Sequence, residues 1–170
     1  MKHACIIRPY NNLDYPGCIL GFESNCPAFF AHHEKEEFQV FLQNLIEESG
    51  EHSMYYYVVE FKGQIVACAG FHLPENEGKT AGLVWGMVTR EFQRRGIGEM
   101  LLDFRLNKIR ELRPGVSVVL DTTQLSFPFF EKAGFRTTKI TKDYCAPGLD
   151  RYDMILKPAF QIDRSKLLLI

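Results

Sequence analysis

The chain has 170 residues, of which 46% are hydrophobic and 24% charged, a composition that supports a buried core and excludes an intrinsically disordered protein. Its formal net charge of −1 gives no overall attraction to nucleic acid or to an anionic membrane surface. We expect residues 1–170 to form one domain, since a domain has roughly 100–200 residues.

The five cysteines are scattered along the chain and include no CxxC pair. This favours reduced thiols over a disulfide framework or a zinc site. Arg8 and Pro9 interrupt the N-terminal apolar stretch, which therefore lacks the core of a signal peptide, and no apolar run approaches the roughly 20 residues of a membrane span. We expect a cytoplasmic protein with no metal, no membrane contact and no nucleic-acid partner.

The first quarter of the chain alternates between strand and helix patterns. A strand is predicted over residues 4–8 and a short helix, capped by Asn11 or Asn12, over residues 11–20. An amphipathic helix follows over residues 34–48, with apolar side chains at spacings of three and four and acidic side chains in its first turn.

The middle of the chain is rich in β patterns. Strands over residues 53–61 and 64–73 are joined by a tight hairpin in which Gly63 supplies a positive φ. Another strand is predicted over residues 80–88. A long helix follows over residues 96–112, and apolar side chains occupy so much of its surface that we expect it to be covered on most sides.

The last third predicts a buried strand over residues 116–121, because its run of β-branched residues is nearly continuous. A short helix over residues 127–133 and a strand over 135–141 follow. A loop over residues 142–150 leads into the last strand, over 151–157. The order of elements predicts an α/β protein with a mixed sheet and helices on its faces.

The long helix opens with QRRGIGE, residues 93–99, although glycine is about 1 kcal/mol less favourable than alanine in a helix. First-turn N–H groups have no partner inside a helix, so a helix N-terminus favours anions. Gly96 and Gly98 remove the Cβ atoms that would keep a phosphate away, and Arg94 and Arg95 add positive charge. The pattern predicts a pyrophosphate site.

Two better-known phosphate motifs do not fit. The segment lacks the Walker A pattern GxxxxGK[ST], and no third glycine follows Gly98 to complete the dinucleotide fingerprint GxGxxG. The pattern QxxGxG after a strand ending in WGMV, followed by FFEKAGF, resembles the GNAT superfamily of acetyl-CoA-dependent N-acetyltransferases. The resemblance spans most of the chain and implies the GNAT fold, with about seven strands and about four helices and a splay between the fourth and fifth strands.

The resemblance also implies acetyl-CoA as co-substrate and the residues that bind it. The backbone of Met87 and Val88 would bind the pantetheine arm, and a β-bulge at Gly86 would hold the central strands apart. Phe130 is a candidate for the wall of the thioester channel, although of Phe129 and Phe130 one would pack in the core and the other would line that channel. The pyrophosphate loop is implied at Gln93, Arg94, Arg95, Gly96, Ile97, Gly98 and Glu99.

Acetyl transfer needs an amine lone pair, stabilisation of an oxyanion and a proton for the departing thiolate. The resemblance implies the Val88 N–H as the oxyanion donor. The family often has a tyrosine where this chain has Phe130, which has no proton to give. Water could supply the proton, or a hydroxyl group could; the candidates are Thr122, Thr123, Ser126 and Tyr144.

Four further residues are candidates for the chemistry. His72, at a strand end, and Asp121, at the end of a buried strand, are possible catalytic bases. A structural histidine and a helix-capping aspartate are the simpler interpretations. Trp85 either walls the acceptor pocket or packs in the core, and Gln124 is a candidate substrate-binding residue.

The predicted function is transfer of an acetyl group from acetyl-CoA to a primary amine of a small molecule or a protein. Two alternatives stay open: a catalytically weak acyl-CoA sensor, suggested by Phe130, and an N-acyltransferase for longer acyl chains. The tail, residues 159–170, ends in four apolar residues. We expect it to pack on its own domain or on a second copy, and we expect a homodimer.

Overall fold

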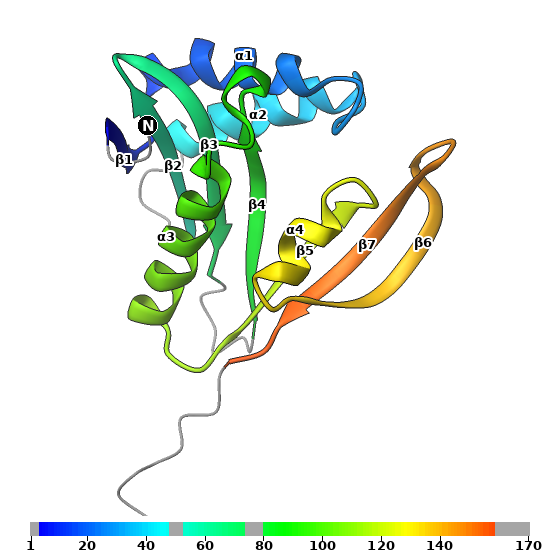
Figure 1. Ribbon diagram of the computed structural model, residues 1–170. Coiled ribbons are helices and arrows are strands. Elements are labelled where there is room, and N and C mark those ends of the chain that lie inside the picture. Colours follow the sequence, from blue (N-terminus) through cyan, green and yellow to red (C-terminus); the bar gives the residue numbers. More distant parts are fainter. Residues whose placement is uncertain (1–3, 48–52, 74–79, 159–170) are drawn as a thin grey trace, which may run out of the picture.

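The computed structural model describes residues 4–47, 53–73 and 80–158. These residues form a seven-stranded mixed sheet with helices on both faces (Figure 1). The predicted tail 159–170 lies outside the described residues, as does Glu48, the last residue of the predicted second helix.

The strands are β1 (Cys5–Pro9), β2 (Met54–Phe61), β3 (Gln64–His72), β4 (Thr80–Val88), β5 (Ser117–Thr123), β6 (Arg136–Ala146) and β7 (Leu149–Leu156). The helices are α1 (Tyr15–Asn25), α2 (Glu34–Glu47), α3 (Ile97–Leu112) and α4 (Phe127–Lys132), with short 3-10 helices at Asn12–Asp14 and Arg90–Phe92.

The strand order is β1-β2-β3-β4-β5-β7-β6. All neighbours are antiparallel except β4 and β5, which are parallel and pair only from Thr80–Gly82 to Ser117–Val119. Beyond Gly82 the two strands diverge, as Figure 1 shows. We call the unpaired region between β4 and β5 beyond Gly82 the opening. The predicted splay between the fourth and fifth strands is therefore confirmed.

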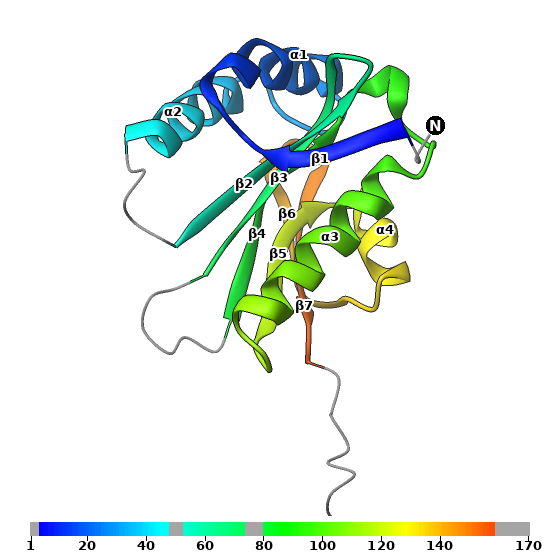
Figure 2. The ribbon, with the colours of Figure 1, turned by 90° about the vertical axis from the view of Figure 1, so that its left-hand side faces the viewer.

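The helices divide the core between the two faces of the sheet (Figure 2). On one face, α1 and α2 pack against β2, β3 and β4 around the fully buried Phe22, Phe38 and Leu42. On the other face, α3 and α4 cover β3, β4, β5 and β7, and the buried residues of α3 include Leu102 and Ile109. The prediction that the long helix is covered on most sides is wrong. The sheet covers one side of α3, Met100 and Phe104 are only half-buried, and Asp103, Asn107 and Arg110 are exposed.

The β3–β4 ladder contains the predicted β-bulge. Cys68 pairs with Met87 and Gly70 pairs with Val84, so that two residues of β4, Trp85 and Gly86, oppose one residue of β3. Trp85 has a φ of 39°, in the left-handed region that a bulky residue rarely adopts. The bulge turns the end of β4 away from β5 and so positions the opening.

The first helix begins and ends later than the predicted range 11–20. Asn11 does act as a cap, but of the 3-10 helix at Asn12–Asp14, where it forms a capping box with Asp14. The α-helix begins at Tyr15, with a proline in its first turn, and continues to Asn25. Gly21, which directly follows Leu20, does not end the helix. The buried Phe22 and Asn25 give the extra turn its packing.

The predicted loop over residues 142–150 is wrong, because β6 continues to Ala146 and β7 begins at Leu149. The polar and turn-forming residues there form an irregular strand end and not a loop. The register shifts between Thr141 and Ala146, and Asp143 has a φ of 52°. The Asp143 side chain accepts a hydrogen bond from Gly148 N–H, which closes the turn.

Candidate active site

The N-terminus of α3 lies next to the end of β4. Gly96 is the N-cap of α3 and has a φ of 77°, and Arg94 has a φ of 57°. Helical bonding begins when Met100 N–H donates to Gly96 O at 3.1 Å. The first-turn N–H groups before it have no partner within the helix. Their positive dipole end is a suitable cradle for a phosphate.

The missing side chain of Gly98 allows α3, α4 and the end of β4 to approach one another at this cradle. A Cβ on Gly98 would lie 3.6 Å from Phe129 Cζ of α4 and 3.6 Å from Val88 Cγ2 of β4. These are ordinary contacts for one methyl group, but they leave little space for a branched side chain. Arg94 and Arg95 are exposed beside the cradle, and the Arg95 guanidinium lies 5.4 Å from the centre of the Phe92 ring.

Two side-chain amides bind the backbone carbonyl of Val88. Asn25 Nδ2 donates to it at 3.0 Å and Gln93 Nε2 at 3.1 Å. Gln93 Nε2 also lies 2.7 Å from Asn25 Oδ1. The Gln93 side chain thus ties the end of α1 to the end of β4, and the Val88 carbonyl has both lone pairs engaged. The sequence did not point to Asn25, which is 2% exposed.

The Val88 N–H faces the opening. Thr89 N–H donates to Val66 O of β3 at 2.9 Å. Because backbone groups of successive residues in a strand point to opposite edges, the N–H and C=O of Val88 point away from β3. The carbonyl is engaged by Asn25 and Gln93, so the N–H is the group of Val88 that a ligand in the opening could reach.

The two phenylalanines of FFEKAGF have different surroundings. Phe129 contacts the Gly98 position, as described above. The Phe130 ring packs edge-on against Phe129 at 5.0 Å and against the buried Phe135 at 5.7 Å. Phe129 is therefore the ring at the cradle, and Phe130 belongs to the core between α4 and the sheet.

The two candidate bases lie in different places. His72 pairs with Gly82 on β4, six residues before Val88, which corresponds to about 20 Å along a strand. Asp121 is not a helix cap: β5 extends to Thr123, so Asp121 lies within the strand, and Ser126 is the N-cap of α4. The Asp121 carboxylate is 3.8 Å from Arg151 Nη2. It alternates with the buried Leu120 and so faces the side of the sheet opposite α3 and α4.

Trp85 and Gln124 both make structural contacts. The Trp85 ring packs in an aromatic cluster with four phenylalanines of α1, α2 and the segment between them, at 5.1 Å from Phe38, and its carbonyl accepts a hydrogen bond from Tyr56 Oη at 2.9 Å. Gln124 holds the β6–β7 turn: its amide nitrogen donates to Gly148 O and its oxygen accepts from Asp150 N–H. Binding of substrate by either residue stays a prediction.

The candidate hydroxyl groups are spread around the end of β5. Thr123 is buried, and its hydroxyl oxygen lies 3.4 Å from Leu125 N. Tyr144 is exposed, and its ring lies beneath the Arg151 guanidinium at 5.0 Å. Thr122 and Ser126 are half-buried. None of these contacts identifies a proton donor.

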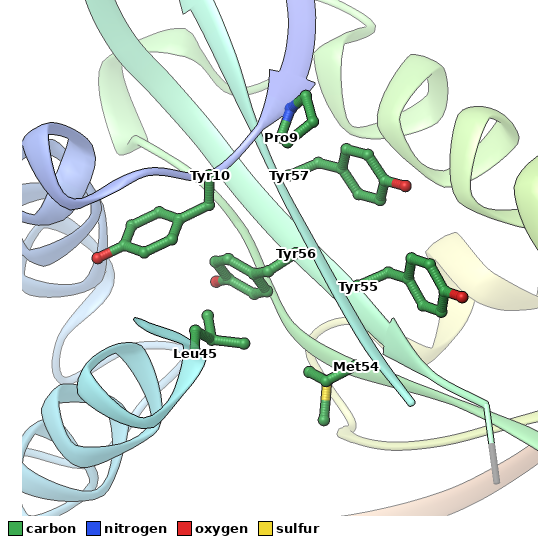
Figure 3. Close-up of a pocket in the computed structure, with 7 residues that line it drawn as sticks. All are labelled: Pro9, Tyr10, Leu45, Met54, Tyr55, Tyr56 and Tyr57. Carbon is green, nitrogen blue, oxygen red and sulfur yellow. The ribbon is translucent and has the colours of Figure 1, made fainter. Parts of the chain in front are cut away.

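A cavity of about 250 Å³ lies elsewhere, at the edge of the sheet where β1 leaves β2. Pro9, Tyr10, Leu45 and residues 54–57 line it. Figure 3 shows that the hydroxyl groups of Tyr55 and Tyr57 point to one side of β2, while Tyr10 points to the other. The polar groups therefore do not converge, and the cavity is separate from the candidate site.

The sequence matches the model of the acetyltransferase (GNAT) family over residues 21–135, more than half of the chain. The chain belongs to the GNAT acetyltransferase family. The matched region includes the end of α1, the central strands, the α3 cradle and α4. It thus contains the whole of the candidate site apart from the β6–β7 hairpin.

Solved structures support the fold. A GNAT-family acetyltransferase from Desulfovibrio desulfuricans has a TM-score of 0.79 and 19% identity, covering 92% of this chain and 100% of its own. A ribosomal-protein-alanine N-acetyltransferase from Brucella melitensis has a TM-score of 0.68 and 19% identity, covering 89% and 99%. An IAA acetyltransferase from Bacillus cereus has a TM-score of 0.66 and 15% identity, covering 90% and 99%. A search of curated proteins gave no match.

Two searches of the described part of the GNAT chain gave negative results. Within residues 4–47, 53–73 and 80–158, no group of three or more His, Cys, Asp or Glu side chains is placed to hold a metal ion. No helix in these ranges is long and apolar enough to cross a membrane. All five cysteines lie within the described residues, and none of them forms a disulfide.

Proposed function

We propose that the protein is an N-acetyltransferase that moves an acetyl group from acetyl-CoA to a primary amine by direct attack in a ternary complex. The observation that carries the proposal is the cradle at the N-terminus of α3. There, Gly96 and Gly98 expose backbone N–H groups directly beside the end of β4 and its opening. A pyrophosphate on the cradle would leave the pantetheine arm to run along the unpaired edge of β4.

The residues around the opening fit this co-substrate. Arg94 and Arg95 are placed to add charge at the phosphates, where arginine forks onto oxygen atoms. The backbone of Met87 and Val88 would extend the sheet with the pantetheine arm. Since Asn25 and Gln93 engage the Val88 carbonyl, we assign to Val88 the donor role of its N–H group, toward the thioester oxygen.

The amine must arrive from the side of the sheet that α3 and α4 do not cover. Asp121 faces this side, and Trp85 lies in the aromatic cluster of α1 and α2 on the same side. Of the two candidate bases, Asp121 is the better placed, because His72 is about 20 Å along the strand from Val88. Phe130 offers no proton, so we assign protonation of the thiolate to water.

The acceptor is an amine, and the similar structures named above suggest where to begin. One is a ribosomal-protein-alanine N-acetyltransferase, which motivates peptides with a free N-terminal amine. Small amines and lysine-containing peptides complete the panel. A catalytically weak acyl-CoA sensor is the second candidate, and the observation that favours it is the core position of Phe130.

The test is an acceptor screen that follows release of free thiol from acetyl-CoA, with product mass as confirmation. We expect thiol release that depends on both the protein and one class of amine. Binding of CoA without turnover of any acceptor would contradict the transferase and support the sensor. Faster turnover of a longer acyl-CoA would replace acetyl transfer by transfer of that longer chain.

A further inference from the structure

Arg105 is a cation in the middle of the core-facing side of α3. It is 5% exposed, and its neighbours on the same side, Leu101, Leu102 and Leu106, are apolar and buried. Burial lowers the pKa of Arg105 to about 10, so the guanidinium carries its charge at neutral pH.

The guanidinium has few partners. Its Nη1 donates to the carbonyl of Gly70 at 3.2 Å, whereas its Nε has no hydrogen-bond partner among the described residues. No carboxylate of these residues forms an ion pair with it. A buried charge without a counter-ion is costly, and such groups are usually paired. A leucine or methionine would fill the same space without this cost, so the charge itself requires an explanation.

The position of the guanidinium supplies one. A Cβ on Gly86 would lie 3.4 Å from both Nη1 and Nη2 of Arg105. Gly86 belongs to the bulge of β4, on the stretch of that strand that has no partner in β5. Only the backbone of Gly86 therefore separates the positive charge from the opening. Any larger residue at position 86 would insert a side chain against the guanidinium.

Arg105 also holds the bulge in place. The β3 strand has one residue, Ala69, opposite two residues of β4. This mismatch disrupts the ladder next to Gly70, whose carbonyl receives the Arg105 hydrogen bond. The same side chain thus binds β3 beside the bulge and places a charge behind Gly86 of β4.

We propose that Arg105 is a positioning residue for acyl transfer, which fixes the Gly86 bulge and polarises the thioester carbonyl from behind it. The inference rests on the proposed function, since the thioester must lie in the opening. The amine nitrogen forms a bond to the carbonyl carbon, and negative charge develops on the carbonyl oxygen. When the C–S bond breaks, this charge passes to the thiolate. The amine loses one proton and the thiolate gains one, so an amide and free CoA result.

Arg105 forms no ion pair among the described residues. In this proposal, the negative charge that develops on the thioester carbonyl oxygen becomes its counter-charge. A fixed cation in a water-poor site stabilises such a charge more strongly than water does, and it needs no reorganisation during the reaction. Arg105 would therefore matter for the carbonyl and for kcat, and little for binding of the CoA portion.

The experiment uses acetyl-CoA labelled with ¹³C at the carbonyl carbon and records its infrared carbonyl band when bound to the protein. Three variants are compared with the parent: Arg105→Met, which removes the charge, Arg105→Lys, which keeps it, and Ile109→Val. Ile109→Val is the matched control, because Ile109 is a buried residue of the same helix that is not among the contacts of Gly86. Calorimetry measures CoA affinity and thermal unfolding measures folding.

We expect the carbonyl band of the parent to lie at a lower frequency than that of free acetyl-CoA. Arg105→Met should lose most of this shift and lower kcat about tenfold to a hundredfold, below the loss of a direct oxyanion donor. The KM for acetyl-CoA and the CoA affinity should change less than threefold. Arg105→Lys should restore part of the shift, and Ile109→Val should keep all of it.

An Arg105→Met variant that binds CoA, folds and keeps the parent's band would overturn the inference while the proposed function stands. If Arg105→Met is too unstable to fold, Arg105→Lys becomes the decisive comparison. A folded Arg105→Lys variant whose carbonyl band lies at the frequency of free acetyl-CoA would equally contradict a role for the charge. If the parent itself binds no acetyl-CoA in the calorimeter, the proposed function fails first and the inference fails with it.

Discussion

Gly70 shows how closely β2 approaches β3. A Cβ at this position would lie 2.5 Å from the backbone oxygen of Tyr55, and a backbone atom cannot move aside as a flexible side chain can. We therefore predict that Gly70→Ala destabilises the protein by about 1–3 kcal/mol, the usual cost of overpacking. Urea denaturation measures the difference. Gly82→Ala is the control, because a Cβ there has no atom within 4 Å, and equal stability of the two variants would refute the prediction.

Phe130 tests the alternative of a proton donor at this position. Its ring packs on Phe129 and Phe135, so Phe130→Tyr should fold but lose about 1 kcal/mol of stability by burying a hydroxyl group. We predict that kcat stays within about threefold of the parent, since a general acid usually contributes about a hundredfold or more. Steady-state kinetics against pH checks this. A large increase in kcat would place the ring at the thiolate and reopen the assignment to water.

Individual residues show where inference from the sequence is strong and where it fails. Gly63, Gly86 and Gly96 were placed in a hairpin, a bulge and a helix start, because a glycine there has a local backbone reason. Asn25 and Arg105 were missed, since each acts through a contact with a distant segment. An arginine within an apolar helical stripe was the available signal for Arg105. The interpretation of Asp121 as the cap of α4 is wrong, because β5 continues past its apolar residues to Thr123.

At the scale of elements, the Arg8–Asp14 pair connects β1 to the start of α1. Asp14 is 3% exposed, and Arg8 Nη1 and Nη2 each donate to its carboxylate at 2.7 Å. Burial alone would raise the pKa of Asp14, but the hydrogen bonds from Arg8 and from Asn11 N–H outweigh it and lower the pKa below its ordinary value of 3.8. The ionised carboxylate therefore stabilises the folded state.

A carboxyl group with a lowered pKa contributes stability above its unfolded pKa, and this contribution is lost as pH falls through its folded pKa. We predict that Asp14→Asn costs about 3 kcal/mol near pH 7, as for other broken buried pairs. The difference from the parent should shrink as the pH is lowered below 3.8. Urea denaturation across this pH range measures it. Glu23→Gln, which breaks the exposed pair with Lys35, should show almost no effect, and a constant Asp14→Asn deficit at all pH values would count against the linkage.

Whole elements were predicted well where periodicity was strong. The hairpin of β2 and β3, the long helix α3 and the buried strand β5 agree with the sequence to within about two residues. The hairpin of β6 and β7 was not recognised, because its end contains the polar and turn-forming residues Asp143, Pro147 and Gly148. Only the pairing of the two strands, with the side chains of Gln124 and Asp143 closing the turn, makes this segment regular.

At the scale of the whole molecule, the sheet divides between β4 and β5, and α3 begins beside this division. In the proposed function, a thioester would lie between these two strands and an amine would enter from the uncovered side of the sheet. The comparisons establish the fold and the family. The QRRGIGE motif predicts the pyrophosphate loop at residues 93–99. The acceptor could not be predicted, because Trp85 and Gln124 contact segments far away in the sequence, α1 and α2 in one case and the β6–β7 turn in the other, and no local pattern specifies such contacts.

The most direct test of the central claim is a calorimetric titration of CoA into the parent and into Gly98→Val. We predict that the parent binds one CoA per chain. The valine variant should bind CoA at least about tenfold more weakly, or by 1.4 kcal/mol, because its branched side chain would project into the cradle. Gly98→Ala, whose Cβ makes only ordinary contacts at 3.6 Å, should fold and lose less affinity. A Gly98→Val variant that folds and binds CoA as tightly as the parent would contradict the assignment of the α3 N-terminus as the pyrophosphate site.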